Sequence, residues 1–366
     1  MKLQQRLFLQ YIGSWLCAVA LLLPAAYAQN QLPPVAAKPV LAAPTSAVFD
    51  TSNAQNVDAR LLTALRAITG LAADATPSQA LAMATASPAA LPPAIRVQNF
   101  DPQQVFEFND NTALWLHLRV RSDPLSQQRW VINFVNTFLD GVELYVPPSS
   151  GSPQAAVNAW QRQIAGDHIA HSQWSQRTLS PQVILPVMAA GEHDILIKVM
   201  NGFAQQIPVK LMTQHDAEQA NRDSFLRAGL LIGLLCVVLL LSMHLAFTYR
   251  DWTYACYAVY MLLAILAGGA YLGLASYVLW PDAERWPEHS FLVLIQAAVI
   301  AQLWFCQAMF LREGQLRELR LAVYATVGFS VVLGVVYFFM PQADQRNIVF
   351  ALGAGICLAM IFSSSA

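Results

Sequence analysis

Hydrophobic and polar residues alternate along the middle of the chain. Between positions 114 and 121 every second residue is aliphatic, and the residues between them are Trp115, His117, Arg119 and Arg121. Successive side chains point to opposite faces of a strand, so this pattern predicts a strand with one buried face. Similar short segments follow at 130–134, 142–146, 183–187, 193–200 and 206–212. Short strands separated by turn residues, without intervening helices, predict an antiparallel β-sandwich over residues 95–220.

Long apolar runs dominate the chain after residue 224. They approach the length of about 20 residues that a helix needs to cross a hydrocarbon core of about 30 Å. The spans predicted within residues 225–366 are 225–248, 253–274, 290–311, 320–340 and 347–363. The predicted fold class is therefore mixed, with an extracytoplasmic antiparallel β-sandwich followed by an α-helical transmembrane bundle.

The first 94 residues show two different patterns. Residues 1–28 begin with Lys2 and Arg6, continue with an apolar stretch and end with small residues, a layout typical of a cleavable export signal. An uncleaved anchor is the alternative. Residues 29–94 are rich in alanine and proline and predict a flexible leader. Apolar residues at helical spacing predict one short helix within this leader, at 57–71.

Arginine residues orient the predicted spans. If the sandwich lies outside, the first and third loops between spans are cytoplasmic, and they hold more arginines than the other two loops, as the positive-inside rule requires. The cytoplasmic loops hold Arg250, Arg312, Arg317 and Arg320, and the outer loops hold Arg285 and Arg346. We therefore expect a multi-pass protein of the bacterial inner membrane with its N-terminal domain in the periplasm. Because the last span reaches the cytoplasm only at the final residues, we also expect the chain to be a fragment of a longer protein.

Composition narrows the classes of function. Hydrophobic residues make up 56% of the chain and charged residues 12%, against about 25% charged in soluble proteins. The net charge is −1 with no basic block, which argues against nucleic-acid binding. All five cysteines lie in hydrophobic runs, so the exported region has no disulfide framework.

The sequence offers no catalytic constellation, and we expect neither a cofactor nor a metal. Gly268, Gly269 and Gly273 lie in a predicted span, where small residues allow helices to pack closely. His168 and His171 could together bind a metal, but the sequence shows no third ligand nearby, and a polar loop is the favoured interpretation.

Recognition of a small ligand, with a carbohydrate as one candidate, is chemically more plausible than catalysis or metal binding. An exposed aromatic ring can stack on a sugar, while charged side chains hydrogen-bond its hydroxyl groups. The alternative is that the tryptophans are buried in the sandwich core. The candidate ligand-binding residues are Trp115, Arg119, Trp160, Asp167, Trp174 and Arg177.

Several segments of the exported region resemble a known family. They are residues 113–118 (ALWLHL), 130–134 (WVINF), 140–145 (DGVELY), 165–167 (AGD) with Arg177, and 191–199 (GEHDILIKV). Together they resemble the second type of extracellular domain in the seven-transmembrane receptors with diverse intracellular signalling modules (7TMR-DISM), and the helices from Phe225 are similar to that family's membrane domain. The resemblance implies a jelly-roll sandwich like carbohydrate-binding modules, seven helices, and a cytoplasmic output such as a diguanylate cyclase, a histidine kinase or a phosphatase. This chain departs from the pattern, with five predicted spans and no output domain.

The leading hypothesis is a receptor whose sandwich binds an extracytoplasmic small molecule and whose helices lie in the lipid bilayer. Any catalytic output would lie beyond the last residue. Two other classes stay open: a component of a membrane transporter, and an envelope protein whose sandwich binds a partner protein. Whether the chain forms a homodimer also stays open.

Overall fold

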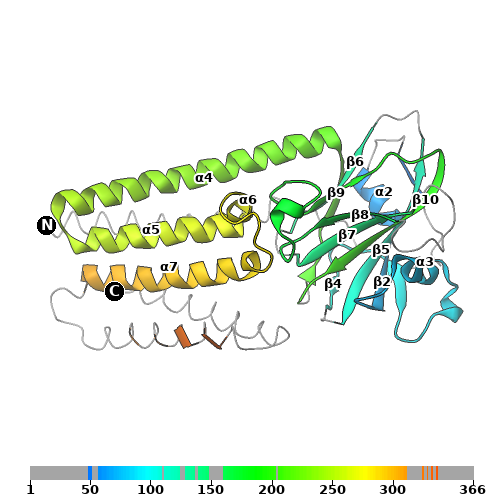
Figure 1. Cartoon of the computed structure of the whole chain (residues 1–366), viewed down its shortest axis with the longest axis horizontal. Coiled ribbons are helices and arrows are strands. Elements are labelled where there is room, and N and C mark those ends of the chain that lie inside the picture. Colours follow the sequence, from blue (N-terminus) through cyan, green and yellow to red (C-terminus); the bar gives the residue numbers. More distant parts are fainter. Residues whose placement is uncertain are drawn as a thin grey trace.

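The computed structural model describes residues 48–51, 57–108, 111–123, 128–136, 139–147, 160–202 and 205–310, together with six helical positions between 324 and 336. In this part of the chain a domain of β-sheets is followed by long helices that extend away from it (Figure 1). This arrangement confirms the predicted order of an antiparallel sheet domain and then helices.

The larger sheet contains seven strands. They are β1 (Phe49–Asp50), β2 (Leu65–Ala72), β3 (Arg96–Asn99), β5 (Thr112–Ser122), β7 (Gly141–Val146), β8 (Gln161–Ala165) and β10 (Gly191–Met200). Their order is β3-β2-β5-β10-β7-β8, and β1 pairs with β5. The β1–β5 pair is parallel, and the other pairs are antiparallel.

Two smaller sheets complete the domain. The first has the order β12-β6-β9 and the second joins β11 to β4, all in antiparallel pairs. These strands are β4 (Val105–Phe106), β6 (Trp130–Phe134), β9 (Gln182–Leu185), β11 (Gln205–Gln206) and β12 (Val209–Thr213). Strands distant in sequence therefore become neighbours in both main sheets.

The main core lies between the seven-stranded and the three-stranded sheets. Leu116 and Leu118 of β5 contribute to it from one side, and Ile132 of β6 from the other. Trp130 of β6 is 2% exposed and meets the ring of Phe49 edge to face, with centroids 5.8 Å apart. The alternation in β5 thus points its aliphatic residues into this core, as the sequence predicted.

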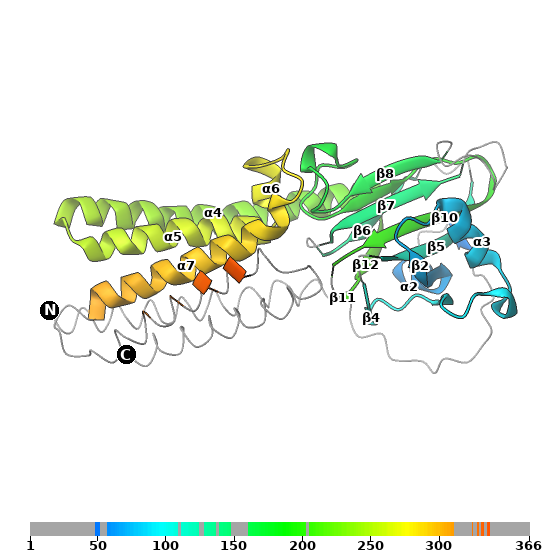
Figure 2. The same ribbon diagram turned by 60° about the horizontal axis from the view of Figure 1, so that its bottom comes forward.

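A second apolar cluster covers the opposite face of the large sheet. Trp115 of β5 and Tyr145 of β7 are stacked there with centroids 5.7 Å apart. Helix α3 (Pro77–Thr85) packs over them through Ala80 and Ala84. A 3-10 turn, η1 (Pro88–Ala90), follows α3. Figure 2 shows α3 beside the large sheet, and Trp115 is fully buried beneath this cover.

The prediction of a flexible leader over 29–94 is wrong for its second half. A short helix is present, α2 (Val57–Ala64), but β2 follows it directly and pairs with both β3 and β5. Leu65 and Ile68 of β2 are fully buried. Their spacing fits a helix as well as a strand, and only long-range pairing with β5 selects the strand.

Helix α4 (Gln214–Tyr249) continues directly from the sheet domain. Its N-cap is Thr213, the last residue of β12, whose side chain accepts a hydrogen bond from the Asp216 amide at 3.1 Å. With 36 residues the helix is about 54 Å long, well beyond the bilayer core of about 30 Å. No linker separates β12 from the first membrane helix.

The remaining helices are α5 (Trp252–Tyr271), α6 (Leu274–Val278) and α7 (Trp286–Phe310). Three of the described helices are long and apolar enough to cross a bilayer, over Gln214–Tyr249, Trp252–Tyr271 and His289–Met309. They correspond to the first three predicted spans, although α5 ends before the predicted boundary at 274. The predicted spans 320–340 and 347–363 lie outside the described residues, except for the isolated helical positions in the former.

Candidate functional site

The three candidate tryptophans are buried. Trp115 is fully buried, Trp160 is 5% exposed and Trp174 is 9% exposed. An exposed ring that could stack on a sugar is therefore not available at these positions in this structure. The reason is packing, because Trp115 and Trp160 belong to the apolar cluster on the outer face of the large sheet.

Arg119 belongs to a charged group on that same outer face. Its Nε donates to Oδ1 of Asp194 at 3.0 Å, and Nε2 of His117 donates to the same oxygen at 2.8 Å. Burial by itself raises the pKa of the Asp194 carboxyl group, but the hydrogen bonds from these two partners and their charges together outweigh burial and hold the pKa below its ordinary value. Arg119 is thus engaged in holding β5 to β10.

Asp167, Trp174 and Arg177 all lie in the segment that connects β8 to β9, residues 166–181, which we call the junction loop. Trp174 fixes the loop's shape, because its indole Nε1 donates to the carbonyls of Gly166 and Ile169 at 2.9 and 3.1 Å. A short 3-10 turn, η3 (His171–Gln173), precedes Trp174. The structure therefore brings half of the predicted site residues together in one loop.

The junction loop packs against the helices. The backbone amide of Ser172 donates to the carbonyl of Pro281, between α6 and α7, at 2.9 Å. The ring of His171 meets the ring of Tyr277 on α6, with centroids 5.4 Å apart. Tyr277 in turn contacts Phe225 of α4, at 5.1 Å between centroids. Figures 1 and 2 both show this loop beside α6.

Gly273 makes close contact between the loop and the helices possible. It starts α6 with a φ of 73°, and an added Cβ would lie 2.6 Å from the carbonyl oxygen of Leu179. The sequence assigned Gly273 to helix packing, but the group that approaches it is the junction loop. For Gly268, no atom outside its own helix in the described part of the chain lies within 4 Å of an added Cβ.

A second contact joins β9 to α4. The side-chain amides of Gln182 and Asn221 exchange two hydrogen bonds, of 2.9 and 3.2 Å. Gln182 is 3% exposed, so this pair is shielded from water on the sheet side. The sheet domain is therefore attached to the helices by the β12–α4 connection, the Gln182–Asn221 pair and the junction loop.

A cavity of about 600 Å³ opens beside the junction loop. Its polar lining comes from the sheet domain, the junction loop, and the segment between α6 and α7. The polar residues that matter most for ligand chemistry are Asp140, Glu143, Arg162, His168, Gln173 and Glu284. The cavity thus lies where the sheet domain meets the helix-connecting segment.

Glu143 anchors one wall of this cavity. It is 5% exposed and accepts hydrogen bonds from the hydroxyl of Tyr145 and the guanidinium of Arg162. Burial, followed by the bond to Glu143, raises the pKa of Tyr145, so that side chain is a neutral donor at physiological pH. Arg162 is half exposed and keeps part of its charge available to the cavity.

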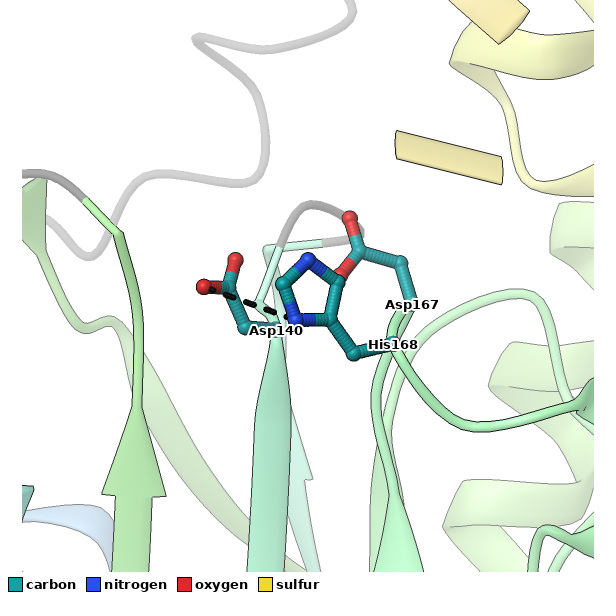
Figure 3. A group of neighbouring side chains, drawn as sticks. All are labelled: Asp140, Asp167 and His168. Atoms are coloured by element: carbon teal, nitrogen blue, oxygen red, sulfur yellow. Dashed lines mark ion pairs between the residues drawn. The ribbon is translucent and has the colours of Figure 1, made fainter. Parts of the chain in front are cut away.

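Asp140, Asp167 and His168 form a compact group at the cavity edge (Figure 3). One side-chain ligand atom from each lies within 4.8 Å of the others, so the three could together hold a metal ion. His168 also forms an ion pair with Asp140 at 3.9 Å, which accounts for their proximity without an ion. We assign no metal to this group.

Backbone hydrogen bonds hold the group in place. The amides of Asp167 and His168 donate to the carbonyls of Leu139 and Asp140, at 2.9 and 3.1 Å. Gly166 has a φ of 137°, and an added Cβ would lie 2.5 Å from the Asp140 carbonyl oxygen. The turn at Leu139 and Asp140 is therefore held against the turn at Asp167 and His168, although the two are distant in sequence.

Sequence reasoning missed Asp140, Glu143 and Glu284 as parts of a site. Asp140 and Glu143 stand out in the sequence only within the segment 140–145 that resembles the family, and Glu284 does not stand out at all. Neither this segment nor the three-residue spacing of His168 and His171 indicates that they lie close to the distant Glu284.

Two family models match the chain. The first, 7TMR-DISM extracellular 2, matches residues 73–213, and the second, 7TM diverse intracellular signalling, matches residues 224–366. No curated protein matches the chain. Together with the fold, these matches define a multi-pass membrane protein with an extracellular N-terminal sensor domain. The chain belongs to the 7TMR-DISM family, which confirms the resemblance. Neither matched domain is a catalytic domain.

Proposed function

We propose that this chain is the sensing and membrane-spanning part of a receptor in the bacterial inner membrane. Residues 1–28 direct the sheet domain to the periplasm, where it binds a small molecule. The helices relay binding to a cytoplasmic effector such as a diguanylate cyclase or a histidine kinase. The main support for the proposal is the position of the junction loop, which lines the cavity and also packs against the helices.

The junction loop gives ligand binding a route to the helices. His168 and Gln173 line the cavity, while Ser172, between them, is bonded to Pro281 in the helix domain. A ligand shifts an equilibrium only by the difference in its affinity for the two states. A molecule that contacts both this loop and Glu284 has a different affinity for the two states, because movement of the loop changes the distance between the loop residues and Glu284.

A carbohydrate is the ligand class that we propose. The volume of the cavity falls within the range of about 300–1,000 Å³ that is usual for small-molecule sites. Carboxylate, guanidinium, imidazole and amide groups converge on it, and these groups hydrogen-bond well to hydroxyls. The jelly-roll topology expected for the family agrees with a carbohydrate ligand.

Replacement of Glu284 by alanine should weaken ligand binding without disturbing the sheet domain. Loss of a hydrogen bond to a charged group costs about 1.5–3 kcal/mol, which corresponds to about 10- to 100-fold in affinity. The whole chain in lipid nanodiscs would first be screened against mono- and disaccharides by thermal shift. Calorimetry would then compare the affinity of the best sugar for the parent and for Glu284→Ala.

Asp282→Ala is the matched control. Asp282 is an exposed acid in the same segment, but it does not line the cavity. Its replacement should leave the affinity unchanged. If no sugar stabilises the parent chain, the carbohydrate assignment is wrong, and equal losses for the two variants would show that the cavity is not the binding site.

A further inference from the structure

His171 is buried where the sensor domain meets the helices. It is 3% exposed, and its ring lies between Trp174 of its own loop and Tyr277 of α6, at centroid distances of 4.4 and 5.4 Å. The next residue, Ser172, forms the hydrogen bond to Pro281. The imidazole is therefore part of the contact that attaches the junction loop to the helix domain.

The surroundings of His171 select its neutral form. Nε2 lies 2.9 Å from the carbonyl oxygen of Thr178, and because a carbonyl only accepts, Nε2 must carry the proton. Nδ1 is buried and has no hydrogen-bond partner within the described part of the chain. A second proton on Nδ1 would create a buried cation with an unsatisfied N–H group, which is costly.

Few charged groups face this imidazole. From its own loop, the Asp167 carboxylate lines the small cavity beside it, and Arg177 repels a positive charge. The helix side of that cavity is formed by four residues that do not titrate: Ala270 of α5, Gly273 of the α5–α6 turn, Ser276 of α6 and Pro287 of α7. Helix α6 adds the phenol of Tyr277. Burial lowers the pKa of His171 below its ordinary value of 6.5; the Thr178 carbonyl opposes this shift, and Arg177 adds to it.

We propose that His171 makes the junction a proton-sensitive latch, which holds the sensor domain on the helices at neutral pH and loosens when the extracytoplasmic side becomes acidic. This inference rests on the proposed receptor function and adds the proton as a second input. The released loop exposes His171 to water, where the imidazole binds its proton more readily. The docked state binds fewer protons than the released state, so docking is strongest above the ordinary pKa of histidine and weakens as the pH falls below it.

Distance measurements across the junction test the latch. Spin labels would be attached at Gln173, which is exposed in the junction loop, and at Trp252, which is exposed at the far end of α5. The labels would be placed in the whole chain in nanodiscs after replacement of its five cysteines. Double electron–electron resonance should give one narrow distance distribution at about pH 7.5 and a growing population of longer distances at about pH 5.5. His171→Gln, which keeps a donor for Thr178 but does not titrate, should give the narrow distribution at both values.

His171→Phe is a second non-titrating variant in case the glutamine disturbs folding, since it retains a ring between Trp174 and Tyr277. His193→Gln is the control, because His193 lies in the sheet domain, where its Nε2 donates to the carbonyl of Ala189, and its replacement should leave the pH response intact. A narrow distribution at both pH values in the parent would overturn the latch and leave the receptor proposal standing. Persistence of the pH response in the His171 variants would also overturn it. A broad distribution already at neutral pH would contradict docking itself, and the receptor proposal with it.

Discussion

Replacement of Gly273 by alanine is expected to release the junction loop from the helices. The added Cβ would lie 2.6 Å from the Leu179 carbonyl oxygen, and the residue would also have to keep a positive φ of 73°. A left-handed conformation costs a residue with a Cβ about 1–3 kcal/mol, and the clash with a backbone oxygen can be relieved only if the loop moves away. Docking of the loop should therefore weaken by at least this amount.

Hydrogen exchange at the Ser172 amide measures this effect. That amide donates across the junction to Pro281, so its protection reports docking of the loop. A weakening of about 1–3 kcal/mol corresponds to exchange about 5- to 150-fold faster. Gly268→Ala is the matched control, because among the described residues no atom outside its own helix would lie within 4 Å of the added Cβ, and alanine favours a helix. Unchanged protection of Ser172 in Gly273→Ala would show that the loop does not dock on this turn.

Replacement of Trp130 by alanine is expected to destabilise the sheet domain strongly. Trp130 fills the core between the two main sheets, and its indole donates to the Thr51 carbonyl at 3.2 Å. Truncation of a buried tryptophan to alanine costs about 3–5 kcal/mol, against a total stability of about 5–15 kcal/mol for a domain. The melting temperature of the sheet domain should fall by about 10 °C or more.

Circular dichroism of the β signal during heating would measure that fall. Trp252→Ala is the control, because this tryptophan starts α5 and is 74% exposed. It should leave the sheet domain's melting temperature unchanged. A shift in Trp130→Ala no larger than that of the control would mean that the two sheets do not share this core.

The sequence predicted the sheet domain best where one face of a strand is buried. Alternation in β5 placed Leu116 and Leu118 in the main core because the period of two is a local property. It could not predict that Trp115, on the opposite face, is buried too. That burial comes from α3, which packs over the sheet from a segment that the sequence predicted to be a leader.

The segment that contains β2 shows the limit of local patterns. Its apolar residues fit both a helix and a strand, and nothing within the segment indicates pairing with β5, more than forty residues away. Long-range hydrogen bonds between strands decide such cases, and one sequence does not reveal them.

The candidate site was predicted only in part, for a similar reason. Asp167, Trp174 and Arg177 are close in sequence and were selected together, and the structure places all three in the junction loop. Asp140 and Glu284 reach the same cavity from a turn in the sheet domain and from the α6–α7 segment. A site assembled from three distant segments leaves no spacing that a motif could capture.

Disulfide trapping of the junction would show whether the exported sensor domain docks on the helices. Ser172→Cys and Pro281→Cys replace two residues whose backbones are hydrogen-bonded to each other, in a chain without its native cysteines. A disulfide between them requires both close approach and an oxidising compartment. We expect this pair to form a disulfide in intact cells, whereas Ser172→Cys with Arg250→Cys, at the far end of α4, should not. Failure of the Ser172–Pro281 pair to cross-link, in protein that reaches the membrane, would contradict docking of an exported sensor domain on the helices.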